Sequence, residues 1–425
     1  MRRFALFLIM TAALLAGCGV QQSVTVEPLP LPTSAGEVVV TMVPQPEQPQ
    51  ATENPQVEQP APVEPQPSEP AAAPQEPAWI AYTGDDGNIW MVNPGSGEMR
   101  QVTEDGTPMN SVWDGDIVSY DPPQWSSDGQ MIAALRQHGK PVESGYEFTF
   151  SVLVYDLQSQ TSRTLLEGQQ MLGAAWRPGT RQIAYGQYLN TAYFATRGQP
   201  DPTYAQGIWT VDVDSGETAE LVKPERGLAL ARPSFSPDGR YVAFQEIYMM
   251  EGAGKFGYYD LQEQQYHSWD KPIGPFSWSS DSQRIAYAYL TYMPSGEESI
   301  YTNTIQGDAE KRLLPENAPD SYAFGPVFSP DGSQIAYIQE LIADRLPEGA
   351  QPNSQVMVMP VEGGEPRSLG IFDQPGELEW SADGQNLLLG IGPHYAGRQV
   401  ALLSVSNGTL KPLTNGVFAS WQPLP

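Results

Sequence analysis

Serine and aspartate recur in this sequence at a fixed spacing that could serve either chemistry or chain reversal. Residues 234–244 read SFSPDGRYVAF, with Ser236 two positions before Asp238, and variants of this stretch return at roughly 40- to 60-residue intervals. A carboxylate beside a hydroxyl could bind an ion or activate a nucleophile. The Pro-Asp-Gly run is also typical of tight turns, because proline presets φ, aspartate bonds to nearby backbone and glycine tolerates positive φ. We therefore interpret the repeated aspartates as turn residues.

Few other groups in the chain could do chemistry. There are three histidines, His138, His267 and His394, and a single cysteine, Cys18, so an internal disulfide framework is excluded. Residues 212–217, DVDSGE, resemble a calcium loop but lack the full set of alternating oxygen ligands. We expect a hairpin turn there, histidines at the surface, and no catalytic, metal-binding or cofactor-binding residues.

The elements that position these residues are predicted hairpins. In six repeats a lead aromatic residue is followed seven positions later by a small apolar triplet such as Ile183-Ala184-Tyr185. Turn residues such as Asp331-Gly332 lie between the two, so each repeat begins with two antiparallel strands. The lead aromatics are Trp125, Trp176, Phe235, Trp278, Phe328 and Trp380.

A third and a fourth strand complete each repeat. Residues 356–359 are a typical third strand, and a basic-then-apolar piece such as residues 163–166 is a typical fourth. Four antiparallel strands make a propeller blade. The domain begins near Ile80 with strands two to four and ends around Trp421 with a lone first strand. We therefore predict an all-β, seven-bladed β-propeller of four-stranded antiparallel blades over residues 78–425, whose C-terminal strand closes the ring by completing the first blade.

The repeat W/F-S-P-D-G-x-x-I-A-Y, followed by I-Y-x-x-D and a final R-x-L, resembles the WD-like propeller repeat of the TolB family and the propeller parts of prolyl oligopeptidases. The resemblance covers residues 79–423. TolB proteins carry a small α/β domain before a six-bladed ring and bind the peptidoglycan-associated lipoprotein. A seven-bladed chain with a proline-rich segment in place of that domain is not expected to be a TolB orthologue.

Two enzyme classes share the resemblance. Prolyl oligopeptidases need a G-x-S-x-G nucleophile elbow, which this sequence lacks. Some propeller lyases that act on pectin fragments resemble the repeat and hold a divalent ion with clustered histidines. Here His138 and His394 are expected in connections between second and third strands, and His267 in an outer fourth strand, far from any central site. A metal-assisted polysaccharide lyase or hydrolase is kept as the alternative function.

The N-terminal segment predicts export and lipid attachment. Arg2 and Arg3 precede an apolar run over residues 4–15, too short to span a bilayer but suited to a signal-peptide core. Leu15-Ala16-Gly17-Cys18 resembles the lipobox of bacterial lipoproteins, which implies cleavage before Cys18 and diacylglyceryl attachment to its thiol. An ordinary secretory signal with an incidental cysteine is the other interpretation. We expect residues 1–17 to be a signal peptide and the protein to be lipid-anchored in the bacterial cell envelope, outside the cytoplasm: at the outer membrane or in the periplasm of a two-membrane cell, or on the outer face of a single membrane.

Residues 18–77 are rich in proline, glutamine and glutamate, with eight Glu and no Asp, Lys or Arg. Such a segment cannot bury enough apolar surface to offset its ordering entropy, so we predict a disordered, lipid-anchored linker. The whole chain has a formal net charge of −28 at pH 7. This charge excludes a nucleic-acid partner, because phosphate binding needs clustered Lys and Arg.

Long connections are predicted on one face of the ring. We call this the upper face; it carries the connections from strand two to three and from strand four to the next blade, while the lower face carries the short turns. Loops on a rigid scaffold often carry binding, and Tyr, Trp and Met are typical of contact surfaces. The candidate binding residues are Trp113, Tyr120, Tyr188, Tyr193, Phe194, Tyr204, Tyr248, Met249 and Tyr292. These side chains could instead pack down as lids over the blades.

The function predicted from these features is a non-enzymatic, membrane-anchored binding or scaffold module. Its partners are expected to be the membrane, through the lipid on Cys18, and an envelope protein or a cell-wall polymer, with the protein itself a monomer. A structural envelope protein without a specific ligand is a third hypothesis.

Overall fold

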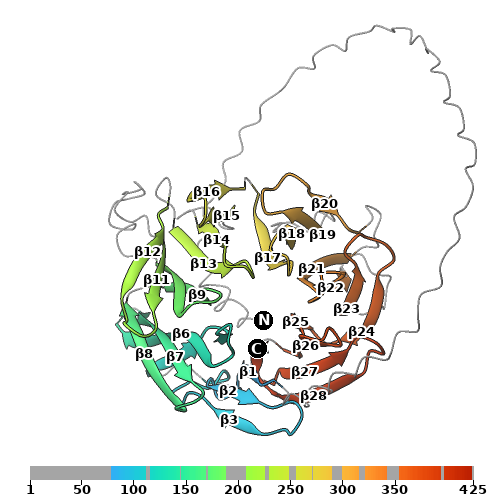
Figure 1. The fold of residues 1–425 in the computed structure, drawn as a ribbon. Coiled ribbons are helices and arrows are strands. Elements are labelled where there is room, and N and C mark those ends of the chain that lie inside the picture. Colours follow the sequence, from blue (N-terminus) through green and yellow to red (C-terminus); the bar gives the residue numbers. More distant parts are fainter. Residues whose placement is uncertain are drawn as a thin grey trace, which may run out of the picture. The chain divides into compact units, whose positions relative to one another are not determined.

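The computed structural model describes residues 78–111, 115–143, 145–168, 171–187, 207–224, 229–247, 255–269, 271–289, 299–314, 321–341, 354–393 and 397–423. Every regular element within these ranges is a β-strand, and the strands form seven sheets arranged around a ring (Figure 1). No helix that could span a membrane occurs in this part of the chain.

The first blade contains β1 (Ile80–Thr83), β2 (Ile89–Val92), β3 (Met99–Gln101) and β29 (Val417–Trp421). The second contains β4 (Ile117–Tyr120), β5 (Gln124–Trp125), β6 (Met131–Val142), β7 (Gly145–Asp156) and β8 (Thr161–Gly168). The third contains β9 (Met171–Trp176), β10 (Gln182–Gln187), β11 (Ile208–Asp212) and β12 (Thr218–Val222), and the fourth β13 (Ala229–Phe235), β14 (Tyr241–Ile247), β15 (Lys255–Asp260) and β16 (Gln265–Ser268). The fifth contains β17 (Ile273–Trp278), β18 (Arg284–Tyr289), β19 (Ile300–Thr304) and β20 (Lys311–Arg312). The sixth contains β21 (Ser321–Phe328), β22 (Gln334–Leu341), β23 (Ser354–Pro360) and β24 (Arg367–Phe372), and the seventh β25 (Gly376–Trp380), β26 (Asn386–Ile391), β27 (Gln399–Ser404) and β28 (Leu410–Asn415).

The C-terminal strand closes the ring as the sequence predicts. In the first blade the strand order is β29-β1-β2-β3, with β29 antiparallel to β1 and Trp421 opposite Ile80. First strands such as β9, β13, β17, β21 and β25 lie nearest the centre of the ring, and fourth strands lie outermost (Figure 1). The seven-bladed, four-stranded antiparallel architecture is therefore confirmed.

The apolar triplets supply the core between blades. In the fifth blade Ile285, Ala286 and Tyr287 are each 0% exposed. Ile285 and Tyr287 pack in a cluster with fourth-blade residues, while Ala286 packs with the sixth blade. Successive residues of a strand point to opposite faces, so one triplet contributes to both blade interfaces.

The lead tryptophans join neighbouring blades by hydrogen bonds from their indole nitrogens. Trp176 Nε1 donates to Gln124 O at 3.0 Å, and Trp380 Nε1 donates to Val327 O at 3.1 Å. Each acceptor lies one position before the lead aromatic of the preceding blade. A tryptophan at this position thus combines apolar burial with a satisfied polar group.

The second blade departs from the sequence prediction. The segment between residues 104 and 124, expected as a long connection, contains β4, which pairs with β6 from Tyr120 opposite Arg136 to Ile117 opposite Gly139. His138 lies within β6, opposite Thr149, rather than in a connection. The cause is the length of the β6–β7 hairpin, whose strands span 12 residues each.

Candidate functional site

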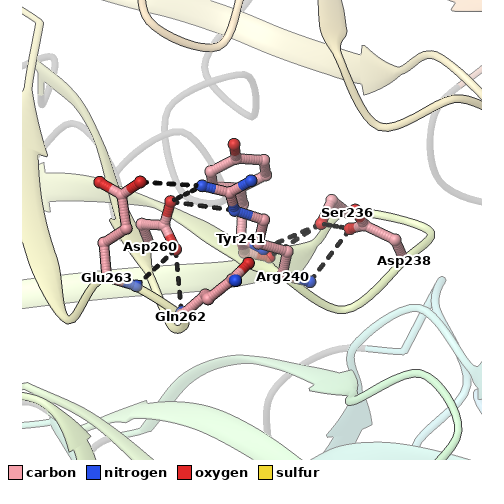
Figure 2. Close-up of polar contacts among 7 residues, drawn as sticks. All are labelled: Ser236, Asp238, Arg240, Tyr241, Asp260, Gln262 and Glu263. Carbon is pink, nitrogen blue, oxygen red and sulfur yellow. Dashed lines mark hydrogen bonds and ion pairs between the residues drawn. The ribbon is translucent and has the colours of Figure 1, made fainter.

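On the lower face, the repeated serine and aspartate hold the turn between the first and second strands (Figure 2). In the fourth blade Ser236 Oγ donates to Asp238 Oδ1 at 2.6 Å and accepts from Tyr241 N at 2.9 Å. Asp238 Oδ1 also accepts from Arg240 N at 3.0 Å. Burial acts to raise the pKa of Asp238, but these hydrogen bonds outweigh it and hold the pKa below its ordinary value. Both side chains are engaged within the turn.

Arg240 connects this turn to the next one on the same face. Its Nε and Nη2 atoms donate to Asp260 Oδ2 at 3.0 and 2.6 Å, and Nη2 lies 3.3 Å from Glu263 Oε1 (Figure 2). Asp260 Oδ1 accepts from the backbone nitrogens of Gln262 and Glu263 at 2.9 and 3.0 Å. The network ties the two lower turns of the blade together, so its charges serve the fold.

The same serine–aspartate contact recurs in four other blades, at 2.5 to 2.6 Å between oxygens. The pairs are Ser126 with Asp128, Ser279 with Asp281, Ser329 with Asp331 and Ser381 with Asp383. The next residue of the turn has φ between 62° and 69° in the second to seventh blades, and it is glycine everywhere except Ser282; in the third blade it follows Pro178 instead of an aspartate. The interpretation of these aspartates as turn residues agrees with the contacts.

The two histidines that the structure describes, His138 and His267, lie in different blades. His138 Nε2 lies 3.0 Å from Asp116 Oδ2 in the second blade, and His267 in the outer strand β16 stacks on Tyr258 at 4.6 Å between ring centroids. His394 lies outside the described residues. Within the described part of the chain no three His, Cys, Asp or Glu side chains are placed to share a metal ion.

The segment that resembles a calcium loop forms a hairpin turn. Asp212 Oδ1 accepts from the backbone nitrogens of Asp214 and Ser215 at 3.0 and 2.9 Å. Asp214 is held by Arg181, with Nε 2.7 Å from Oδ2. The two carboxylates are therefore used by the backbone and by an arginine.

A cavity of about 210 Å³ opens between the second and third blades on the lower side. Its lining residues are Met131, Val154, Asp156, Ser159, Thr161, Arg163 and Arg181. Arg163 Nη2 donates to Val213 O, and Asp156 Oδ1 accepts from Ser159 N at 2.7 Å. These bonds hold the polar groups of the cavity in fixed positions against an apolar floor.

Of the candidate binding residues, the structure describes Tyr120. Its ring is 6% exposed, and its hydroxyl donates to Asp105. Asp105 also accepts from Arg136 Nε and Nη2 at 2.9 and 2.6 Å. Burial raises the pKa of Tyr120, and the neighbouring Asp105 carboxylate adds to the rise. Tyr120 thus fixes β4 against β6. Trp113, Tyr188, Tyr193, Phe194, Tyr204, Tyr248, Met249 and Tyr292 lie outside the described residues, as does Cys18.

The upper part of the second blade is an extension that the sequence analysis missed. Strands β6 and β7 continue past the blade core and pair up to Val142 opposite Gly145. On one side Tyr146 stacks against Phe148 at 6.0 Å between ring centroids, and Tyr146 Oη donates to Gly115 O at 3.2 Å. At the tip Val142 is 47% exposed. The alternation of aromatic and polar residues in residues 145–150, GYEFTF, is the sequence signal for this extension.

A second missed feature lies on the inner strands, three positions before each lead aromatic. The residues there are Pro122, Gly173, Arg232, Pro275, Gly325, Glu377 and Phe418. Gly173, Arg232, Gly325, Glu377 and Phe418 have φ between 53° and 74°, and the strand register shifts beside each of them. A bulge at this place turns the strand and redirects the bulged side chain. No residue type marks it, so the sequence carries no common signal.

The inner bulges place charge and aromatic surface on the free edges of the first strands. Arg232 is exposed, Glu377 is half-buried and Phe418 is 38% exposed. Asp121 is exposed as well, yet the surrounding protein disfavours its charged form and raises its pKa to about 6, with the positive charge of Arg232 opposing the rise. Asp121 and Arg232 belong to the second and fourth blades. We call Asp121, Arg232, Glu377 and Phe418 the inner rim; it offers both signs of charge and an aromatic ring.

Comparison with known proteins gives the fold alone. No family model matches the sequence, and no curated protein matches it. Among solved structures, an oligogalacturonate lyase in complex with manganese is similar over 80% of this chain and 85% of that chain, with 13% identity and a TM-score of 0.54. A prolyl endopeptidase is similar over 80% of this chain and 47% of that chain, with 14% identity and a TM-score of 0.55. TolB from Acinetobacter baumannii is similar over 73% of this chain and 83% of that chain, with 16% identity and a TM-score of 0.43. The likeness to the lyase and to the endopeptidase shows that this chain shares the β-propeller fold with them.

Proposed function

We propose that this protein is a membrane-anchored, extracytoplasmic lipoprotein whose propeller binds an envelope protein or a cell-wall polymer and catalyses no reaction. The anchoring rests on the lipobox-like Leu15-Ala16-Gly17-Cys18. The observation that carries the binding role is the extension of the second blade on the upper face. In the other blades the second and third strands span 4 to 8 residues, whereas β6 and β7 span 12.

The extension is not required to close the ring. Its outer residues lie beyond the blade interfaces, and Lys140, Val142, Glu143 and Glu147 near its tip are exposed. Ordering each backbone residue costs about 1 to 2 kcal/mol, so an ordered protrusion outside the core has no folding benefit of matching size. A rigid, mixed apolar and charged protrusion suits contact with a partner surface.

The state of the reactive side chains supports a binding role over catalysis. The repeated serines and aspartates hold turns, and His138 and His267 lie in different blades. A group that already satisfies a structural hydrogen bond must break it before it can act on a substrate.

Two kinds of variant test the proposal. One replaces residues 141–146 by Asn-Gly, which shortens the hairpin to the paired residues Lys140 and Glu147 in the register of the natural turn. The other is Val142→Asp, matched by Ile371→Asp on the outer strand β24, where Ile371 is 62% exposed. We expect the shortened hairpin and Val142→Asp to reduce co-sedimentation with cell-wall sacculi, or capture of a crosslinked envelope protein, at least tenfold. Ile371→Asp should leave both unchanged.

If all three variants co-sediment with sacculi and capture the crosslinked protein as well as the wild type does, the extension is excluded as the binding site. Cleavage of acidic oligosaccharides that a chelator abolishes would replace the proposal by the metal-assisted lyase or hydrolase. Cys18→Ala tests the anchor separately, because the protein should then leave the membrane fraction while its binding is unchanged.

A further inference from the structure

The closing strand β29 belongs to two blades at once. It pairs with β1 in the first blade, but in sequence it follows β28 of the seventh blade after the single residue Gly416. The β29–β1 ladder is short and irregular, with a register shift between Ala81 and Thr83. Contacts other than this ladder therefore matter for where β29 lies.

Two carboxylates of the seventh blade bind the backbone of β29. Glu377 Oε2 accepts from Phe418 N at 2.7 Å, and both oxygens of Glu379 lie 3.3 Å from Trp421 N. Both glutamates come from β25, the first strand of the seventh blade. They satisfy two donors on the edge of β29 that β1 does not cover.

Arg398 lies behind these contacts and joins them to the rest of the blade. Its side chain is 0% exposed, and Nη1 donates to Gln374 O at 2.9 Å and to Gly392 O at 2.6 Å. Its Nε lies 3.7 Å from Glu377 Oε1, and its carbonyl oxygen accepts from Gly416 N at 2.8 Å. One buried residue thus contacts both the glutamate that binds β29 and Gly416, the residue immediately before β29.

Two glycines make room for this arginine. A Cβ atom on Gly390 would lie 2.3 Å from Arg398 Nε, and one on Gly376 would lie 2.6 Å from Nη2. Both contacts are shorter than van der Waals distances allow. The missing side chains of these two glycines, in β25 and β26, therefore leave the space that the guanidinium group occupies.

The junction between the fifth and sixth blades offers a direct comparison. There Ser277, at the position that Glu379 occupies in the seventh blade, accepts from Phe328 N at 3.2 Å. A serine hydroxyl is the acceptor inside the continuous part of the ring. Two carboxyl groups are the acceptors where the chain ends meet, and one of them lies beside the buried guanidinium of Arg398.

We propose that Glu377, Glu379 and Arg398 form a clamp that docks β29 on the seventh blade, so that the ring opens and closes between β29 and β1. In the open form β29 stays on the seventh blade and the edge of β1 becomes free. The clamp presents a preformed strand to β1, which removes most of the ordering entropy from the closing step.

Hydrogen exchange read by mass spectrometry on the whole protein tests the clamp. We expect the double variant Glu377→Ala/Glu379→Ala, which removes both acceptors, to raise exchange in a peptide covering residues 417–423 at least tenfold, with no change in peptides from the third to fifth blades. Ser277→Ala is the matched control, and it should raise exchange at Phe328 without affecting β29.

If the double variant exchanges in residues 417–423 as the wild type does, or faster to the same degree in every blade, the clamp is refuted. Arg398→Lys should give the same local pattern, because lysine cannot reach the two carbonyl oxygens and Glu377 together. If Arg398→Lys or the double variant does not fold, Glu377→Ala alone decides the question, since it removes one acceptor and keeps the other.

Discussion

The carboxyl group of Glu379 should make the protein less stable as pH rises through neutrality. It lies half-buried between β25 and β29, and burial raises its pKa from 4.5 to about 8, against the opposing hydrogen bond from Trp421 N. The indole Nε1 of Trp421, which lies in the same junction, has no hydrogen-bond partner among the described residues. The protonated carboxyl is therefore the form that this site favours.

The sign follows from the number of protons bound. Between pH 4.5 and 8 the folded protein keeps the proton on Glu379 and the unfolded chain has lost it, so the free energy of unfolding decreases with pH across this window and is level above it. Full burial would set an upper limit of about 5 kcal/mol, at about 1.4 kcal/mol for each tenfold change in proton affinity. Because the side chain is only partly buried, solvent screening reduces the expected effect to about 1 to 2 kcal/mol.

Glu379→Gln keeps the shape of the neutral acid and removes the titration. Thermal unfolding at pH 5.0, 7.0 and 8.5 should show the variant equal to the wild type at pH 5.0 and more stable at pH 8.5, by about 2 to 4 °C for a domain of this size. Asp331→Asn is the control, because hydrogen bonds from Ser329 and Ser333 lower the pKa of Asp331 to about 2, outside the measured window. Parallel profiles for wild type and Glu379→Gln would show that the carboxyl is ionised in the folded protein, and the reasoning would fail.

Four further substitutions test the repeat itself. Gly332→Ala should lower the free energy of unfolding by about 1 kcal/mol in urea titration, because φ is 69° there and the nearest atom to the new Cβ would be 3.6 Å away, which leaves backbone strain as the only cost. Ser236→Ala should cost about 1 to 3 kcal/mol, since it leaves the buried Tyr241 N without its acceptor; a cost below 0.5 kcal/mol would contradict the structural role of the serine. Tyr337→Phe should be neutral or stabilising by up to about 1 kcal/mol, because the hydroxyl of this fully buried residue has no partner among the described residues. Tyr287→Phe at the same repeat position should destabilise, because Tyr287 Oη donates to Glu310 Oε2 at 3.0 Å, and equal effects of the two would refute this assignment.

The blade number and the ring closure could be predicted because both depend on residues that every repeat must supply. The lead aromatic, the Asp-Gly turn and the apolar triplet each meet a local demand: an interblade hydrogen bond, a positive φ and burial on two faces. Only a few residue types meet each of these demands, so the same types recur in the sequence at a fixed spacing. The incomplete repeats at the two ends follow the same pattern, which is why Trp421 could be assigned to the first blade.

The inner bulge could not be predicted, although the backbone repeats it around the ring. The bulged residue is Gly173 in one blade, Arg232 in the next and Phe418 in another, so no single residue type marks the position. The second-blade extension was missed for a different reason. Strand β4 is only four residues long and pairs with the extended part of β6, so it could not be predicted unless the alternation in residues 145–150 had first been interpreted as a strand.

The inner bulges and the second-blade extension differ from the repeated positions in how strongly the packing between blades restricts their residue types. Positions that pack between blades are alike because one geometry constrains them all, and their polar groups are already bonded within the turns. The residues at the inner bulges differ from blade to blade, yet Arg232, Glu377 and Phe418 all have a left-handed backbone. For any residue other than glycine, this backbone costs about 1 kcal/mol or more. Glu377 uses its strained position to bind Phe418 N, so one of the three has a structural reason for it. Arg232 is exposed and makes no ion pair within the described part of the chain, so no contact of its guanidinium group accounts for its left-handed backbone.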